Sequence, residues 1–222
     1  FVENDIVYMK TVKGPLRVDC IYRRLDDSFL DPKAFNKESV IGVPGLFKSW
    51  RKGNVGILNA IGTGVADDKV VYSYVNKMIV YYLGEQPILN QVETYLCHEK
   101  IQRDYVIENI SKLVVKPANA SGGYGIMIGP KAPLKEREEV INKIKKNPRE
   151  FIAQPLEILS TAPTITENDI EPRHLDLRPF VLSGKTSYVT TGGLTRVALR
   201  KGSTIVNSSQ GGGSKDTLIV DM

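Results

Sequence analysis

Residues 113 to 125 have the composition of a phosphate-binding loop. Lys116 stands at the end of an apolar run, and Gly122, Gly123 and Gly125 follow it. A lysine supplies a positive charge that does not depend on backbone geometry, and glycines lack the Cβ atoms that would keep backbone N–H groups from phosphate oxygens. The stretch therefore predicts a loop that folds over a polyphosphate. These residues alone leave open an ordinary glycine-rich turn with a surface lysine.

Two common kinds of phosphate loop do not fit this stretch. A Walker-type loop requires Gly-Lys-Ser or Gly-Lys-Thr, which does not follow the glycines. A Rossmann-type loop leads into a helix, whereas the sequence after Gly125 is typical of a strand. We therefore expect a hairpin flap with strands at 112–117 and 124–129.

The elements after the flap predict an α+β unit and then a second, mostly antiparallel unit. A charged amphipathic helix is expected at 134–146, since its apolar residues recur on one face, and a strand is expected at 151–156. Glycines then separate short segments of strand-like sequence. The strands expected there are 175–182, 187–191, 194–200 and 203–208.

The region before the flap predicts a strand, a loop and a helix. Residues 16–24 alternate as in a strand, and a glycine-rich stretch follows later. Asp67 and Asp68 are suited to a helix N-terminus, so a helix is expected at 67–83. Its apolar stripe is expected to face a core. The stripe comprises Val71, Val75, Met78 and Tyr82.

Charge and composition exclude several classes of protein. The net charge is +5 and the sequence pI about 9.1, but the densest basic stretch, 131–149, is interleaved with glutamates as on a solvated helix face. This pattern disfavours nucleic acid as a partner and is compatible with small anions. The longest apolar run, 78–83, is far too short for a bilayer span and no signal segment opens the chain, so no membrane association and a cytoplasmic location are expected.

The two cysteines and the first residues support two further expectations. Cys20 and Cys97 both lie in apolar sequence without a nearby cysteine or histidine pair, so both are expected to be buried, reduced thiols. The chain begins with Phe1 and enters strand-like sequence almost at once. We therefore expect an N-terminal remainder of the same protein to exist as a partner of this chain.

Several segments resemble the ATP-grasp superfamily of carboxylate ligases when they are taken in order. They are Lys69, the flap with Lys116, Gln154-Pro155-Leu156, Asp176-Leu177-Arg178, the segment 192–196 that ends in Arg196, and the segment 206–212 that contains Asn207. More narrowly, segments 23–27, 59–64 and 211–216 resemble the circularly permuted ATP-grasp type 2 proteins, which are related to glutathionylspermidine and glutathione synthetases. The resemblance covers most of the chain.

The resemblance implies an α+β class and a circularly permuted ATP-grasp fold, with two α+β lobes and the nucleotide between them. It also implies a division of the chain into four parts. These are 1–66, part of the central or substrate-side lobe; 67–110, a helical connection carrying the first nucleotide lysine; 111–165, the small subdomain with the glycine-rich flap; and 166–222, the second lobe of mostly antiparallel strands.

The resemblance also implies roles for individual residues, with ATP and Mg²⁺ as cofactors. Arg178 and Arg196 are expected to be catalytic. The residues expected to bind the nucleotide are Lys69, Lys116, Ser121, Gly122, Gly123, Tyr124, Gln154, Pro155, Leu156 and Asn207. The metal is expected at Asp176 and Asn207, with Asp216 as a further candidate. Ala120 departs from the family pattern, because glutathione synthetases place a glutamate near that position.

The function that this resemblance implies is ATP-dependent ligation of a carboxylate to an amine through an acyl phosphate. The partners would be small-molecule or peptide carboxylates and amines. Arg23, Arg24, Asp26 and Asp27 could recognise such an acid or amine, but ion pairing at the surface explains them equally well. Two other readings stay open: a non-catalytic nucleotide-binding module of the same fold, and a sugar-binding α+β protein.

Overall fold

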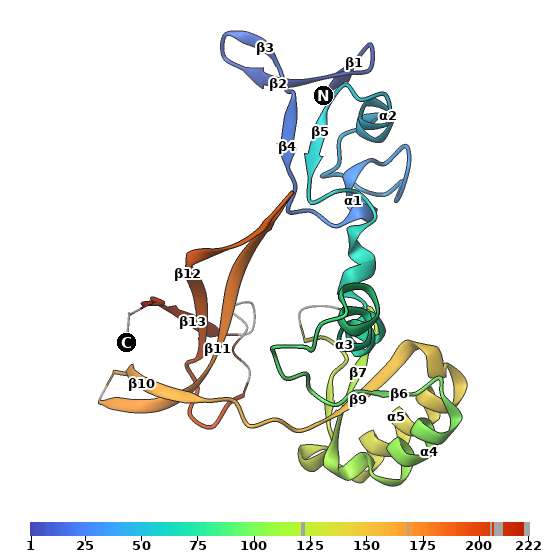
Figure 1. Ribbon diagram of the computed structural model, residues 1–222, viewed down its shortest axis with the longest axis vertical. Helices are drawn as coiled ribbons and strands as arrows, with labels where there is room; N and C mark the ends of the chain where they lie inside the picture. Colours follow the sequence, from blue (N-terminus) through green and yellow to red (C-terminus); the bar gives the residue numbers. More distant parts are fainter. Residues whose placement is uncertain (121–122, 168, 205, 207–210, 220–222) are drawn as a thin grey trace. The chain divides into compact units, whose positions relative to one another are not determined.

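A computed structural model describes residues 1–120, 123–167, 169–204, 206 and 211–219 (Figure 1). The chain divides into two compact units, Phe1–Leu89 and Asn90–Met222. Helices are combined with mostly antiparallel sheets, which fits the α+β class expected from the sequence. The finer division at 66, 110 and 165 stays a prediction.

The first unit contains two small sheets. An antiparallel sheet has the order β1-β2-β3, from strands Val2–Glu3, Ile6–Thr11 and Gly14–Arg17. A parallel pair is formed by β4 (Cys20–Tyr22) and β5 (Gly56–Leu58). The prediction of one strand at 16–24 is therefore wrong, because β3 and β4 join different sheets.

Four helical segments complete the first unit. They are α1 (Asp27–Leu30), α2 (Leu46–Arg51), the 3₁₀ helix η1 (Thr63–Asp67) and α3 (Lys69–Leu83). The helix expected at 67–83 is confirmed as α3, and it begins at Lys69 because the Asp68 side chain caps it, accepting a 2.8 Å hydrogen bond from the Val70 N–H. The core of the unit comprises Val7, Leu30, Leu46, Val55 and Ile57.

The prediction that an apolar stripe of α3 faces a core is wrong for Val75 and Tyr82, whereas Val71 and Met78 are half-buried. Val75 is 38% exposed and Tyr82 is 75% exposed, whereas Val70 is the buried residue of the helix. The sequence shows that one helix face is apolar, but it does not show what covers that face.

The second unit begins with a four-stranded sheet of order β6-β9-β7-β8, in which every pairing is antiparallel. Its strands are β6 (Tyr95–Leu96), β7 (Leu113–Pro117), β8 (Met127–Ile128) and β9 (Phe151–Pro155). Because β7 and β8 pair directly, the expected hairpin is confirmed. The second strand is shorter than the expected 124–129, since a turn precedes it and a 3₁₀ helix begins at Gly129.

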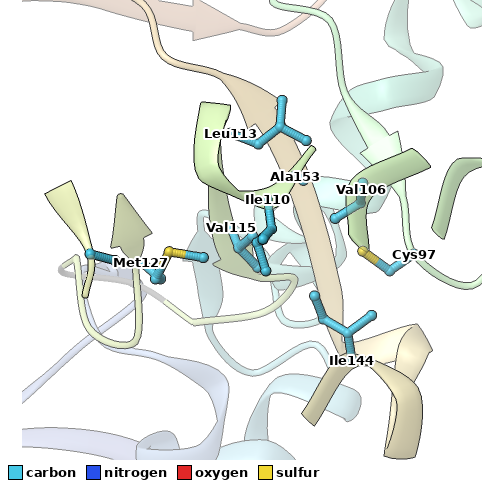
Figure 2. Packing of buried hydrophobic residues seen from close by; sticks show 9 residues of the cluster. Cys97, Val106, Ile110, Leu113, Val115, Met127, Ile144 and Ala153 are labelled. Atoms are coloured by element: carbon cyan, nitrogen blue, oxygen red, sulfur yellow. The ribbon is translucent and has the colours of Figure 1, made fainter. Parts of the chain in front are cut away.

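Helices pack on one face of this sheet. They are α4 (Lys100–Glu108) and α5 (Leu134–Lys146), with short 3₁₀ helices η2 (Ile110–Lys112), η3 (Gly129–Lys131) and η4 (Pro148–Glu150). The helix expected at 134–146 is confirmed with the same bounds. Figure 2 shows side chains from the helices and strands that meet in one cluster, among them Val106 from α4, Ile144 from α5 and Val115 from β7.

A second sheet follows in the order β10-β11-β12-β13, again antiparallel throughout. Its strands are β10 (Thr161–Ile165), β11 (Ile170–Ser183), β12 (Ser187–Ala198) and β13 (Gly212–Lys215). The two strands expected at 187–191 and 194–200 form one strand. Gly193 lies inside β12, where the backbone of β11 comes close. A Cβ added to Gly193 would lie 3.0 Å from the Arg178 carbonyl oxygen on β11, so a residue without a side chain fits this position. No strand forms at the described residues 203, 204 and 206, so the strand expected at 203–208 is not found there.

The two cysteines differ in environment. Cys97 is buried in the cluster of Figure 2, as expected, but Cys20 is exposed on β4, so the prediction of burial is wrong for Cys20. Both thiols are free. Among the helices in the described part of the chain, none combines the length and the apolar character that crossing a bilayer would take.

Candidate functional site

Lys116 and Gln154 lie side by side on one face of the sheet. Lys116 is in β7 and Gln154 in β9, which are neighbouring strands (Figure 1), and the register pairs Lys116 with Ile152 and Val114 with Gln154. Residues two apart on a strand point to the same face, so the two side chains are diagonal neighbours. The Lys116 Nζ donates a hydrogen bond of 2.6 Å to Gln154 Oε1. The structure therefore joins two residues that the sequence places in the site.

This pair lies on the face of the sheet away from the helices. The neighbouring residues Val115 and Ala153 point into the core cluster, so Lys116 and Gln154 point the other way. Lys116 is half-buried and Gln154 is only 8% exposed. A cation held partly out of water interacts more strongly with an anion than a fully solvated one does.

Gln154 is held in turn by Thr94, which directly precedes β6. The Gln154 Nε2 donates to Thr94 Oγ1 at 2.8 Å, and the Thr94 hydroxyl donates to the Val92 carbonyl oxygen at 3.0 Å. A line of hydrogen bonds thus runs from the Lys116 ammonium to the backbone before β6. The sequence analysis missed Thr94, since a single threonine before a short strand gives no recognisable signal.

The described part of the flap has the backbone expected of a tight loop. Gly123 and Gly125 have positive φ angles of 81° and 70°, and Tyr124 between them is 72% exposed. A Cβ on Gly125 would lie 2.9 Å from Cγ of Pro117, the residue after Lys116. Ser121 and Gly122 lie outside the described residues. The roles expected for residues 121–124 in nucleotide binding stay predictions.

Pro155 and Leu156 follow Gln154 at the end of β9. Pro155 pairs with Leu113, and Leu156 is 36% exposed just beyond the strand. The backbone leaves the sheet here toward β10, as a connection between the two sheets must. Their expected role in binding the nucleotide stays a prediction.

Asp176 and Arg196 face one another on the second sheet. Asp176 in β11 pairs in register with Arg196 in β12, and Arg196 Nε donates to Asp176 Oδ1 at 2.9 Å while Nη2 donates to Oδ2. The Arg196 hydrogen bonds lower the pKa of Asp176, with smaller contributions from the charges of Arg196 and Arg178. In return, the Asp176 carboxylate raises the pKa of Arg196. Arg178 itself is exposed.

The expected metal ligands are not gathered in the described residues. Among these residues, no three His, Cys, Asp or Glu side chains come together. The Asp176 carboxylate is bonded to Arg196, and Asp216 is exposed after β13. Asn207 lies outside the described residues. The metal assignment stays a prediction.

Lys69 is the first residue of α3, in the unit Phe1–Leu89. Burial lowers the pKa of its ammonium, and the neighbouring charges of Asp68 and Asp67 partly oppose this effect. A lysine whose charge is costly to bury gains most from an anionic ligand. This setting is compatible with the expected nucleotide contact and does not test it.

Arg23 is a structural residue within the first unit. It is 8% exposed, and its guanidinium donates five hydrogen bonds, as many as its N–H groups allow. The acceptors join the segments 23–27 and 59–64, which the sequence analysis singled out separately. They are the carbonyl oxygens of Leu25, Asn59 and Ala60, the Asp27 carboxylate and the Thr63 hydroxyl.

These bonds argue against substrate recognition by Arg23 and Asp27, an alternative that the sequence leaves open. With its donors occupied by protein, Arg23 has no N–H group left for a substrate carboxylate. Asp27 is also engaged, since its second oxygen accepts a 3.0 Å hydrogen bond from the Gly62 N–H, and Asp26 caps α1 through Ser28. Arg24 is exposed. The hydrogen bonds of Arg23 and Asp27 thus stabilise the fold of the unit.

Comparison with known proteins identifies relatives along nearly the whole chain. A family model described as "Circularly permuted ATP-grasp type 2" matches residues 1–198. An uncharacterized protein of Synechocystis sp. is 54% identical over 220 residues, covering 99% of this chain and 46% of its own length. An uncharacterized protein of Mycobacterium tuberculosis is 52% identical over 221 residues, covering 99% of this chain and 40% of its own length.

A third relative has a name that describes a reaction. A protein of Frankia casuarinae called "Putative glutamate--cysteine ligase 2-2" is 48% identical over 217 residues, which are 98% of this chain and 25% of that protein. The chain therefore spans less than half the length of these curated relatives.

Proposed function

The chain belongs to the circularly permuted ATP-grasp type 2 family, and on that premise we propose that it contributes the nucleotide site of an ATP-dependent carboxylate–amine ligase. The family fold implies two lobes with the nucleotide between them, and this arrangement is part of the proposal. Kinship with glutathionylspermidine and glutathione synthetases and a cytoplasmic location are further parts of it.

The observation that carries the proposal is the hydrogen bond between Lys116 and Gln154. It holds a half-buried ammonium on the face of the sheet opposite the helices α4 and α5, in the strand that leads into the loop containing Gly123 and Gly125. A cation and a glycine-rich backbone at the same place are suited to the phosphates of a nucleotide. A half-buried lysine bonded to a buried glutamine differs from the exposed lysine expected on an ordinary surface turn.

The proposed reaction has two steps. A substrate carboxylate oxygen attacks the γ-phosphorus of ATP, the bond to ADP breaks, and an acyl phosphate forms. An amine then attacks the acyl carbon, phosphate leaves, and the amine loses a proton as the amide forms. Lys116, Arg178 and Arg196 would stabilise the negative charge on the transferring phosphoryl group, since such reactions depend mainly on alignment and electrostatics.

The flap would contribute by excluding water. Its exposed Tyr124 and the flanking glycines could cover the phosphates, and without such a cover water would hydrolyse the acyl phosphate. Holding the carboxylate against the γ-phosphate would remove an entropic barrier of about 7 to 11 kcal/mol.

Magnesium is part of the proposal because ATP enters such reactions with a bound metal that neutralises phosphate charge. The described residues do not form a cluster of ligands for it, and the Asp176 carboxylate is held by Arg196. We therefore assign no step to the metal.

The substrates are proposed only as classes, a carboxylate and an amine from small molecules or peptides. The name of the Frankia relative describes a ligase that joins such groups, which supports the class of reaction. Because the chain spans 25% of that protein, the name supplies no substrate for this chain.

Replacement of Lys116 tests the proposal. In the full-length protein, Lys116→Met should reduce ATP affinity or ADP release about a hundredfold, the size expected when a charge-stabilising group is removed. Lys112→Met is the matched control, because Lys112 is exposed at the start of the same segment and should be neutral. Unchanged activity in Lys116→Met would reject the assignment.

The same measurements separate the ligase from a non-catalytic module of the same fold. ATP binding that depends on Lys116, with no ADP release in any mixture of acids and amines, would support the non-catalytic module. ADP release that requires both an acid and an amine would support the ligase.

A further inference from the structure

We propose that Thr94 is a positioning residue for Lys116 and acts through the Gln154 amide. The inference rests on the proposed function, because it deepens the role of Lys116 at the phosphate site. Neither the family match nor the names of the relatives assign a role to Thr94.

The direction of each hydrogen bond supports this inference. The Lys116 ammonium can only donate, so Gln154 must present its carbonyl oxygen to it, at 2.6 Å. The amide NH₂ then points the other way and needs an acceptor, which is Thr94 Oγ1 at 2.8 Å. The hydroxyl can serve as that acceptor because its own proton is donated to the Val92 carbonyl oxygen at 3.0 Å.

Thr94 therefore fixes the orientation of the Gln154 amide. An amide has nearly the same shape after rotation by half a turn, and only its hydrogen-bond partners decide between the two orientations. Without an acceptor at residue 94, the buried NH₂ would lose its partner, and the amide could turn to place N–H groups against the ammonium. Lys116 would then lose the Gln154 oxygen as an acceptor.

The register of the sheet makes this arrangement specific to position 94. Tyr95 pairs with Ala153, so Thr94 lies opposite Gln154 as the antiparallel pairing of β6 and β9 is extended by one residue. The three side chains thus come from the residue before β6, from β9 and from β7, and they cross the sheet in a line. Holding a lysine in one conformation before the ligand arrives reduces the ordering that binding must otherwise impose.

The experiment compares Thr94→Val with Thr94→Ser in the full-length protein. Valine keeps the shape of threonine and removes the hydroxyl, whereas serine keeps the hydroxyl. Two quantities are measured: the ¹⁵N NMR signal of the Lys116 ammonium without nucleotide, assigned by its loss in Lys116→Arg, and the affinity for ATP. Thr190→Val is the matched control, because the Thr190 hydroxyl is also partly buried and also donates to a carbonyl two residues away.

We expect Thr94→Val to shift or broaden the ammonium signal and to weaken ATP binding about fivefold, the effect of one net hydrogen bond. Thr94→Ser and Thr190→Val should leave both unchanged. In a Gln154→Met background, Thr94→Val should have no further effect on either quantity, since the connection between Thr94 and Lys116 is already removed.

Two results would overturn the inference: an unchanged ammonium signal in Thr94→Val, or an equal effect of Thr94→Val with and without Gln154. If Thr94→Val does not fold, Thr94→Ala applies the same two criteria. A wild-type protein that does not bind ATP would reject the proposed function alone, because the ammonium signal still decides whether Thr94 positions Lys116.

Discussion

Asp176 and Arg196 occupy facing positions on β11 and β12 and form a two-pronged ion pair. The sequence analysis assigned one of them to the metal and the other to catalysis. The structure shows that each is the principal partner of the other, so a change in either residue removes the main hydrogen-bonding partner of the second.

We predict that Asp176→Asn lowers the free energy of unfolding of this sheet by about 1 kcal/mol near neutral pH, since the pair is partly screened by solvent. Circular dichroism during urea unfolding measures the difference from wild type. Asp19→Asn is the control, because Asp19 forms an exposed ion pair with Arg17 and should give no measurable change.

The effect of Asp176→Asn should also depend on pH. Arg196 lowers the pKa of Asp176 in the folded state, below its ordinary value of 3.8. The contribution of this carboxylate is therefore fully present above pH 3.8 and is lost as the pH falls through the lower, folded-state pKa. The difference between wild type and Asp176→Asn should shrink over that acid range, and a difference that stayed constant there would argue against the ion pair.

Arg23→Lys should destabilise the first unit strongly. Lysine has one charged nitrogen and cannot reach the five acceptor contacts of the buried guanidinium, so we expect a loss of about 3 kcal/mol. Trp50 is the single tryptophan of the chain and packs against the core of this unit, so its fluorescence reports the unfolding. Arg24→Lys, at the exposed neighbour, should be neutral, and equal effects at both positions would contradict the structural role of Arg23.

The two thiols should differ in reactivity. Cys20 is exposed and should react readily with a thiol reagent in the native protein. Cys97 is buried, and this burial raises the pKa of its thiol to about 12, so little thiolate is present near neutral pH. The native Cys20→Ser variant should therefore remain unlabelled, and unfolding in urea should expose Cys97 to the reagent. Rapid native labelling of Cys20→Ser would show that Cys97 is accessible.

Gly125→Ala should disturb the flap. Alanine at a φ of 70° costs about 1 to 2 kcal/mol, and its Cβ would also approach Pro117 Cγ to 2.9 Å. We expect ATP affinity to fall about tenfold as the loop shifts. Gly53→Ala is the control for backbone strain, because Gly53 has a φ of 73° and no atom within 4 Å of its added Cβ. Equal ATP affinity in both variants would show that the flap tolerates the change.

Elements defined by neighbours in sequence were predicted well. The helix at Leu134–Lys146, the cap by Asp68 and the hairpin of β7 and β8 depend on local periodicity, a capping side chain and a glycine-containing loop between neighbouring strands. Predictions that depended on distant residues were less successful. Gly192 and Gly193 within β12 indicated a turn, and only the approach of the β11 backbone reveals why a side chain is absent at Gly193.

Whether a cysteine is buried also depends on residues that are distant in the sequence. Cys20 and Cys97 both lie in apolar sequence, but β4 belongs to a two-stranded pair that leaves Cys20 exposed, whereas helices and a four-stranded sheet enclose Cys97. Hydrophobic neighbours in the sequence do not specify which elements will cover them.

The sequence by itself determined which chemical groups are present and in what order: a lysine before a glycine loop, a glutamine before a proline, and arginines on later strands. Only the tertiary structure decided which of them meet. Lys116 is bonded to Gln154 and, through it, to Thr94 because antiparallel pairing brings three distant segments into register. Arg23 became a structural residue because three of its five acceptors come from a loop more than thirty residues away. Hydrogen bonds are short and directional, so their partners follow from the packing of the strands and not from distance along the chain.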